Sequence, residues 1–330
     1  PGHRGRILSM ARGLLPVGCA ALLLLAGCGS GKKTTDSPPA SVFQHRVDPA
    51  LLDGARAFKE MEDFLTIGPR VSGHPAARKA AEHIAARLKT HGLDAAIDSF
   101  SDTTPAGPMD FHNVIGTRAG AAPGLIILGG HFDSKAGIAG DFIGANDSGS
   151  STGLLLELAR VYGAAEWKGP TLLFGFFDGE EARFTYSDID GLHGSRRLAR
   201  KLKEDGRAGR VLAMINLDMI GDRDLTITLP ADTPPRLARI AFAAADNLAL
   251  RSRIGYFSSS ILDDHVPFQR IGIPAIDLID FQYGSKPGLN DYWHTSADTS
   301  DKLSPDSLAA AGRITVEMVN LLLSGAYASP

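Results

Sequence analysis

The sequence predicts a single α/β domain with a mostly parallel central β-sheet that is flanked by helices on both faces. Three observations lead to this fold class. Helical and strand patterns alternate from Leu51 onward, four strand-like segments are apolar nearly throughout, and polar residues gather where those segments end. Alternation of this kind is typical of the α/β class. Continuously apolar strands are typical of a parallel sheet that is covered on both faces.

The first elements of the domain are expected to be two amphipathic helices. Segments 51–68 and 75–92 carry apolar residues at three- and four-residue spacing, and each ends at a glycine. Strand patterns follow at 95–100 and 113–116.

The four apolar segments should form the centre of the sheet, at 125–130, 171–177, 211–218 and 273–279. Further helical patterns cover 150–162, 193–203, 235–247 and 304–323. We expect one hydrophobic core and no second domain.

The N-terminal segment is interpreted as a leader and lipoprotein-type signal over residues 1–28. Arg12 precedes an apolar run that is too short to span a bilayer as a stable helix. Leu25-Ala26-Gly27-Cys28 resembles the bacterial lipoprotein cleavage box, in which the cysteine is acylated. We therefore expect lipidation at Cys28 and a periplasm-facing protein of the bacterial cell envelope. An ordinary secretory signal with a chance cysteine is the alternative.

The polar, proline-bearing segment 29–50 is expected to be a flexible tether, and residues 51–330 the catalytic domain. Of the 330 residues, 44% are apolar and 22% charged, which is ordinary for a globular protein. The formal net charge of −3 argues against nucleic-acid binding and against a polybasic membrane patch.

Polar residues follow the central strands at the ends where α/β proteins build their sites. His131 follows the first apolar segment, Glu180 and Glu181 follow the second, Asp218 closes the third, and His294 lies in the loop after the fourth. The adjacent glutamates are unusual, because neighbouring like charges repel, and more so when they are buried. They could simply open a helix and favour its dipole. Alternatively, a metal ion offsets the repulsion, with Glu181 as its ligand and Glu180 as a general acid/base.

The chain offers five candidate metal ligands of the types that zinc prefers. They are His131, Asp147, Glu181, Asp218 and His294. If one carboxylate bridges, five ligands give three to each of two metals. Each has an ordinary alternative by itself; the segment around Asp147, for example, could merely cap the helix that begins near residue 150. Their joint occurrence at successive strand ends favours a metal centre. If Cys28 is lipidated and Cys19 is removed with the signal, no cysteine remains for a disulfide or a ligand.

The order of the motifs resembles the zinc aminopeptidase superfamily of α/β exopeptidases, and within it the animal-type glutaminyl cyclases. The motifs are GGHFDSK, GANDSGS, FFDGEEA, LDMIGD, DDHVPF and YWHT, and the resemblance covers residues 55–323. Three features resemble cyclases more than aminopeptidases: Asp263, the first residue of DDHVPF; Trp293, just before His294; and the form HFDSK of the first motif.

The resemblance implies a zinc-dependent glutaminyl-peptide cyclotransferase, which converts N-terminal Gln of peptides or proteins to pyroglutamate and releases ammonia. Zinc would act as a Lewis acid, held by Asp147, Glu181 and His294. Glu180 would be the general acid/base, hydrogen-bonded by the carboxyl groups of Asp218 and Asp263. The substrate pocket would be walled by Trp293, Tyr186 and Ile261. The partners would be peptide N-termini, with membrane contact only through the lipid anchor.

Two other functions stay open at this point. In a dinuclear zinc aminopeptidase, Glu180 would activate a water, and His131 and Asp218 would complete a second zinc site. One zinc is expected for the cyclase, and two for the aminopeptidase. A non-catalytic binding domain would predict loss of Glu180 or of ligands, and all are present. The sequence does not predict the oligomeric state.

The sequence departs from the cyclase pattern at the pocket. Tyr186 stands where the animal cyclases have a Trp, and Asp277 stands where they have a His behind the site. The loop that leads to Trp293 is also longer than theirs. These departures concern the shape of the pocket rather than the metal ligands.

Overall fold

The computed structural model describes residues 46–138, 142–325 and 327. The predicted leader and signal, Cys28 and the predicted tether up to residue 45 lie outside the described residues. Among the helices of the described part, none is long and apolar enough to cross a membrane.

Residues 46–50, at the end of the predicted tether, belong to the folded unit. Arg46 pairs with Glu317, and the main chain of Val47 is hydrogen-bonded on both sides by the side chain of Asn320. Val47 itself is buried. A short 3₁₀ turn, η1 (Pro49–Leu51), follows, and the Asp48 side chain caps it.

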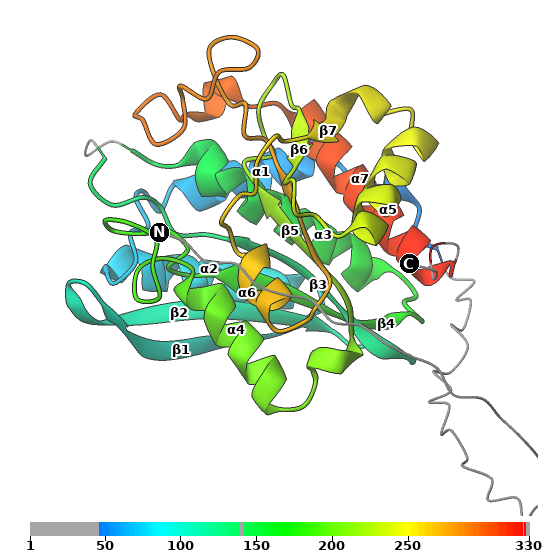
Figure 1. Cartoon of the computed structure of the whole chain (residues 1–330), viewed down its shortest axis with the longest axis horizontal. Coiled ribbons are helices and arrows are strands. Elements are labelled where there is room, and N and C mark those ends of the chain that lie inside the picture. The colour runs from blue at the N-terminus through cyan, green and yellow to red at the C-terminus, as the bar shows by residue number, and fades with distance from the viewer. Residues whose placement is uncertain (1–45, 139–141, 326, 328–330) are drawn as a thin grey trace, which may run out of the picture. The chain divides into compact units, whose positions relative to one another are not determined.

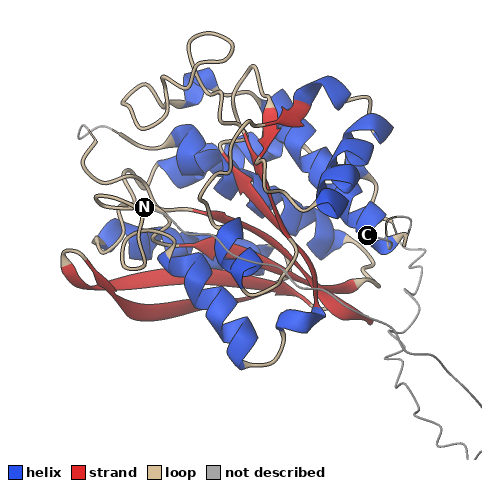
Figure 2. Cartoon of the chain, in the orientation of Figure 1, coloured by secondary structure: helices blue, strands red, loops and turns tan. Residues whose placement is uncertain are grey.

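The predicted, mostly parallel sheet is confirmed (Figure 2). Its strands pair in the order β1-β2-β4-β3-β5-β8-β6-β7. The centre consists of the parallel strands β3 (Ala122–His131), β4 (Pro170–Phe177), β5 (Val211–Asp218) and β8 (Ala275–Ile279). They correspond to the four apolar segments of the sequence.

The edges of the sheet differ from the prediction. β1 (Asp94–Thr104) and β2 (Gly107–Arg118) form an antiparallel hairpin that is longer than the two predicted strands. Most residues of β1 are exposed or half-buried, so the apolar pattern marks only part of it. The sequence analysis missed β6 (Ile227–Leu229) and β7 (Ile254–Tyr256), which at three residues each are too short to show a period.

The helices agree closely with the predicted segments, apart from α6, which was not predicted. Their bounds are α1 (Gly54–Leu65), α2 (Pro75–Thr90), α3 (Ser151–Ala164), α4 (His193–Glu204), α5 (Pro235–Asn247), α6 (His265–Arg270) and α7 (Pro305–Leu323).

Helices cover both faces of the sheet. Successive strand residues point to opposite sides, and in the apolar central strands both sides carry side chains that must be buried. Ile126 and Leu128 of β3 share a core with residues of α1, α2, α3, α5 and α7. Leu125 and Ile127 share a second cluster with residues of α4 and α6. Figure 1 shows α4 and α6 together on one face of the sheet. This arrangement leaves the carboxyl ends of the central strands to carry polar residues.

The central strands end at one edge of the sheet. His131 at the end of β3 pairs with Phe177 at the end of β4, and Asp218 at the end of β5 pairs with Ile279 at the end of β8. The loops that follow these strands therefore meet, as expected for parallel strands.

Candidate metal centre

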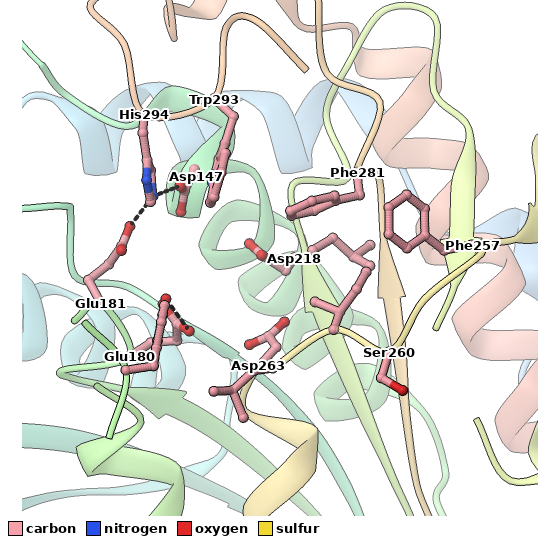
Figure 3. A pocket seen from close by; sticks show the side chains of 14 residues that line it. Asp147, Glu180, Glu181, Asp218, Phe257, Ser260, Asp263, Phe281, Trp293 and His294 are labelled. Carbon is pink, nitrogen blue, oxygen red and sulfur yellow. Dashed lines mark hydrogen bonds and ion pairs between the residues drawn. The ribbon is translucent and has the colours of Figure 1, made fainter. Parts of the chain in front are cut away.

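Asp147, Glu181 and His294, the three predicted ligands of one metal ion, converge at this edge (Figure 3). Nε2 of His294 lies 3.2 Å from Oδ2 of Asp147 and 3.1 Å from Oε1 of Glu181. Both carboxylates are buried, and the histidine is half-buried. One imidazole and two carboxylates, drawn from loops far apart in the sequence, thus form a compact set of three donors.

A second group contains the other two predicted ligands and shares Asp147 with the first. Nε2 of His131 lies 3.1 Å from Oδ1 of Asp147 and 3.3 Å from Oδ1 of Asp218. His131, Asp147 and Asp218 could together hold an ion. The structure therefore brings all five predicted ligands together.

Asp147 is positioned by its main chain. It lies in the helical turn η2 (Ala145–Ser150), which directly precedes α3. The turn begins after Gly144, which has a φ of +57°, and a Cβ there would lie 2.1 Å from the carbonyl oxygen of Asp147. Only glycine fits both conditions. The buried guanidinium of Arg70 donates to the carbonyls of Phe132 and Gly144, which ties this turn to the end of β3.

Glu180 and Glu181 lie in the loop between β4 and α4, and α4 begins only at His193. The alternative that they open a helix is therefore wrong. A single buried carboxylate, that of Asp133, accepts the main-chain N–H of Glu180 at 3.1 Å and that of Glu181 at 3.3 Å. Glu181 then points toward His294 and Asp147, and its second oxygen lies 3.2 Å from the Lys135 ammonium.

His294 is held in an unusual conformation. Its φ is +52°, in the left-handed region that non-glycine residues rarely adopt. The indole of Trp293 stacks on its imidazole ring, with 4.0 Å between the ring centroids. Strain of this kind is frequently found at functional sites.

The electrostatics of the cluster favour a bound cation. Burial, together with the nearby charge of Asp147, raises the pKa of Glu181. Burial also raises the pKa of Asp218 to about 7, although hydrogen bonding to His131 opposes the shift. Burial works against the charged form of His294, yet its hydrogen bonds to Asp147 and Glu181 raise its pKa to about 9. A dense set of buried carboxylates that holds protons in this way is relieved by a divalent ion.

The donor set fits zinc in particular. Zinc takes imidazole nitrogen and carboxylate oxygen, and a catalytic site uses three protein ligands and leaves one position open. The group of Asp147, Glu181 and His294 matches that count, and it opens onto a pocket.

The pocket beside the candidate metal ligands has a volume of about 260 Å³. Glu180, Asp218 and Asp263 lie at its polar side (Figure 3). The predicted wall residues Trp293, Tyr186 and Ile261 all line it. The sequence analysis missed the remaining apolar lining residues, which are Phe257, Leu262, Ile279 and Phe281. Phe257 follows β7, which was itself not predicted.

The hydrogen bonds at Glu180 differ from what the resemblance implies. Its carboxylate is bonded by the Tyr186 hydroxyl, whereas Asp218 is bonded to His131, and Asp263 to Asn216 and to the main chain of Asp264. Among these described residues, no hydrogen bond joins Glu180 to Asp218 or Asp263. Burial raises the pKa of Glu180 well above its ordinary value, and the charges of Glu181 and Asp263 add to the shift.

Three supporting residues were given no role in the sequence analysis. Asp298 holds the main chain at Asp147, Asn216 bridges Asp263 and Asp277, and Lys135 faces Glu181. Each lies within four residues of a predicted ligand or inside a quoted motif, and that proximity is the only signal the sequence offered. His265 is buried beside Asp277, with 3.7 Å between Nδ1 and Oδ2.

Three comparisons place this geometry among known proteins. The sequence profile of peptidase family M28 matches residues 113–319. A glutaminyl-peptide cyclotransferase from Drosophila melanogaster is 31% identical over 295 residues, which cover 79% of each chain. Among solved structures, a glutaminyl cyclase from an Acidobacteriales bacterium matches with a TM-score of 0.77 and 34% identity, covering 86% of this chain and 98% of that one. The structure of the Porphyromonas gingivalis glutaminyl cyclase matches with a TM-score of 0.74 and 27% identity, and the match covers 82% of this chain and 99% of that one.

Proposed function

The chain belongs to peptidase family M28 and, within it, to the glutaminyl-peptide cyclotransferases, and from this premise we propose that it converts N-terminal Gln of peptides to pyroglutamate. The observation that carries the proposal is how the adjacent glutamates are placed. Glu181 joins the metal ligands, while the Glu180 carboxylate faces a small pocket with apolar walls. An intramolecular acyl transfer requires a general base, a Lewis acid and a pocket that binds the substrate. Glu180, the candidate metal ligands and the apolar pocket would supply these three.

Zinc, held by Asp147, Glu181 and His294, would polarise the side-chain amide of the substrate Gln as a Lewis acid. The remaining chemistry falls to the chain. The α-amine of the substrate, whose pKa is near 8, is partly neutral at pH 7 and attacks the amide carbon. Glu180 accepts the proton that the amine loses and delivers it to the departing nitrogen. One C–N bond forms, one breaks, and ammonia leaves.

The apolar walls favour this outcome over hydrolysis. Trp293 and Ile261 line the pocket together with Phe281, whose ring centroid lies 5.2 Å from that of Trp293. Apolar walls keep water away from the activated amide, so that the amine of the substrate is the nearest nucleophile.

One zinc suffices for this reaction, and we propose that one is bound. The second group, His131, Asp147 and Asp218, supports the alternative of a dinuclear aminopeptidase, since it shares Asp147 with the first group. In that function Glu180 would activate a water, and the product would be a free amino acid. The zinc content of the purified protein separates the two, at one or two equivalents per chain.

The direct test is mass spectrometry of a Gln-initiated peptide incubated with the zinc-loaded protein. We expect an intact peptide that is lighter by one ammonia, and no such product with the Glu180→Gln variant, which keeps the size of the side chain. A Leu-initiated peptide should stay unchanged. Removal of the first residue from either peptide would instead establish the aminopeptidase, and no reaction with either would favour the binding domain.

Export and lipidation are a separate proposal that rests on the sequence at Leu25-Ala26-Gly27-Cys28. We expect that cells fed a clickable palmitate analogue label the wild-type protein in the envelope fraction. A Cys28→Ala variant should not be labelled. Equal labelling of both proteins would contradict acylation at Cys28.

A further inference from the structure

The hydroxyl of Tyr186 lies against the carboxylate of Glu180. It is 3.0 Å from Oε1 and 3.1 Å from Oε2, so one O–H group faces both oxygens at once. Among the described residues, no other side chain forms a recorded hydrogen bond with this carboxylate. A glutamate side chain has several rotatable bonds, so the hydroxyl of Tyr186 is the side-chain contact that selects one orientation of this carboxylate.

The ring of Tyr186 is itself fixed. It packs on Gly191, where a Cβ would lie 2.5 Å from Cδ1 and 2.7 Å from Cε1 of the ring. The Lys135 ammonium lies over the ring, 5.6 Å from its centroid. The same ammonium donates to the carbonyl of Ala182, which joins the ring to the start of its own loop. Tyr186 therefore has little freedom to turn away from Glu180.

The loop that carries Tyr186 closes on a buried carboxylate. Asp190 accepts the main-chain N–H groups of Arg183 at 2.7 Å, Phe184 at 2.9 Å and Thr185 at 3.1 Å. The loop then returns to its origin, because the N–H of Leu192 donates to the carbonyl of Glu180 at 2.9 Å. The hydrogen bonds within this loop therefore fix the position of Tyr186 next to Glu180.

The tyrosine acts as a donor in this pair. Burial, together with the charges of Glu180 and Glu181, raises the pKa of Tyr186 well above its ordinary value, so the hydroxyl keeps its proton. A neutral phenol beside a carboxylate can only donate to it.

We propose that Tyr186 is a positioning residue that holds the Glu180 carboxylate in the orientation for proton transfer. This inference rests on the proposed function, in which Glu180 moves a proton between two nitrogens. It goes beyond the wall role that the resemblance implies, since the animal cyclases have a Trp at this position. Proton transfer requires the base to lie within hydrogen-bond reach of the moving proton, so an unanchored carboxylate would react more slowly.

The Tyr186→Phe variant tests this role, because it keeps the ring and removes only the hydroxyl. With a Gln-initiated peptide, kcat should fall by about tenfold to a hundredfold, since small misplacements of catalytic groups cost this much. KM should stay within about twofold, since the wall of the pocket is intact. Tyr162→Phe is the matched control, because its buried hydroxyl has no hydrogen-bond partner within the described part of the chain and does not line the pocket. Its kcat and KM should equal those of wild type.

Two further measurements make the test decisive. In a crystal structure of the zinc-loaded Tyr186→Phe variant, the Glu180 carboxylate should occupy more than one orientation, whereas wild type should show one. Tyr186→Leu, which lacks both ring and hydroxyl, should lose kcat as Tyr186→Phe does and should raise KM in addition.

An unchanged kcat in Tyr186→Phe, with wild type active as a cyclase, would overturn the inference and leave the proposed function intact. If wild type forms no pyroglutamyl peptide, the proposed function fails, and the order of Glu180 in the variant crystal still decides whether Tyr186 positions it. A rise in KM alone would mean that Tyr186 is only a wall of the pocket.

Discussion

The carboxylate of Asp298 accepts a hydrogen bond from the main-chain nitrogen of Asp147 at 3.1 Å. Its other oxygen accepts the N–H of Asn146 at 2.7 Å and the hydroxyl of Tyr283 at 2.9 Å. Asp298 is buried and lies only four residues after His294. The loop that supplies one proposed metal ligand, His294, therefore also supplies the anchor of another, Asp147.

Replacing Asp298 by Asn should weaken zinc binding. The amide keeps one oxygen but turns an NH₂ group toward a main-chain donor, so that Asp147 loses part of its support. Losses of this kind cost about tenfold to a hundredfold in metal affinity, which competition with a chromophoric chelator can measure. Asp301→Asn, an exposed carboxylate in the same segment, is the control and should bind zinc as wild type does. Equal affinity in both variants would contradict the anchoring role.

Removal of zinc should lower the melting temperature. An ion present at about a thousand times its dissociation constant adds ~4 kcal/mol to the folded state, which corresponds to about 10 °C for a domain of this size. Differential scanning calorimetry with and without a chelator measures the shift. His294→Ala, which lacks one ligand, should melt at nearly the same temperature under both conditions. A chelator shift of wild-type size in this variant would place the stabilising ion elsewhere.

Gly191→Ala should disturb Glu180, the proposed catalytic base, from a distance. A methyl group at this position meets the Tyr186 ring, and the residue has a φ of +85°. We expect a loss of about 1–3 kcal/mol in unfolding free energy from the strained backbone, together with a fall in kcat. Gly206→Ala is matched to it, because its φ is +67° and, apart from its chain neighbours, no described residue places an atom within 4 Å of the added Cβ. The control should lose stability and keep its kcat. A similar fall of kcat in both variants would rule out the clash between the added methyl group and the Tyr186 ring as the cause.

Glu60 should contribute a pH-dependent part of the stability. Burial alone would raise its pKa, but the imidazole of His91, 3.5 Å away, and the hydrogen-bonded guanidinium of Arg87 lower it from 4.5 to about 2. A carboxyl group with a depressed pKa stabilises the fold above its unfolded pKa, and this contribution is lost as the pH falls through the folded value. Glu60→Gln should therefore cost about 1 kcal/mol at pH 7, a figure discounted for solvent screening.

The difference in unfolding free energy between Glu60→Gln and wild type should shrink as the pH falls from 4.5 toward 2. Urea unfolding at several pH values measures it. Glu62→Gln, an exposed carboxylate in the same helix, should show little difference at any pH. A difference at Glu60 that stays constant with pH would contradict the ion-pair explanation.

Asn216 should hold two buried carboxyl groups together. Its Nδ2 donates to Asp263 at 2.9 Å and to Asp277 at 3.1 Å. Asn216→Leu removes this donor and leaves two buried carboxyl groups without its hydrogen bonds. The loss should cost about 2–3 kcal/mol of unfolding free energy. Adding Asp277→Asn removes one of the carboxyl groups and should recover part of the loss. Denaturant unfolding of the single and double variants measures both free energies. A double variant that is less stable than the single variant would refute this pairing.

The centre of the fold and the convergence of the candidate metal ligands could be predicted because each leaves a local signal. β5 (Val211–Asp218) is apolar nearly throughout and ends in an acid, and α5 (Pro235–Asn247) shows its period clearly, so both were predicted with their observed bounds. The three residues of β7 carry no period, and their place in the sheet depends on β6 beside them. Tyr186 was predicted as a wall residue, but its bond to Glu180 depends on how Asp190 and Gly191 shape the loop. Contacts of that kind arise from tertiary structure, and the order of residues alone does not encode them visibly.

The shared attachment of Glu180 and Glu181 to Asp133 has a mechanical consequence. Two consecutive main-chain N–H groups are held by the two oxygens of one carboxylate, so a displacement of the strand end carries both side chains in the same direction. The main chain of the two glutamates is thus held as one unit, and the orientation of each carboxylate depends on its own partner, Tyr186 for Glu180 and Lys135 for Glu181. A substitution elsewhere in the pocket wall should therefore alter which substrates enter, whereas one at Tyr186 should also change the orientation of Glu180.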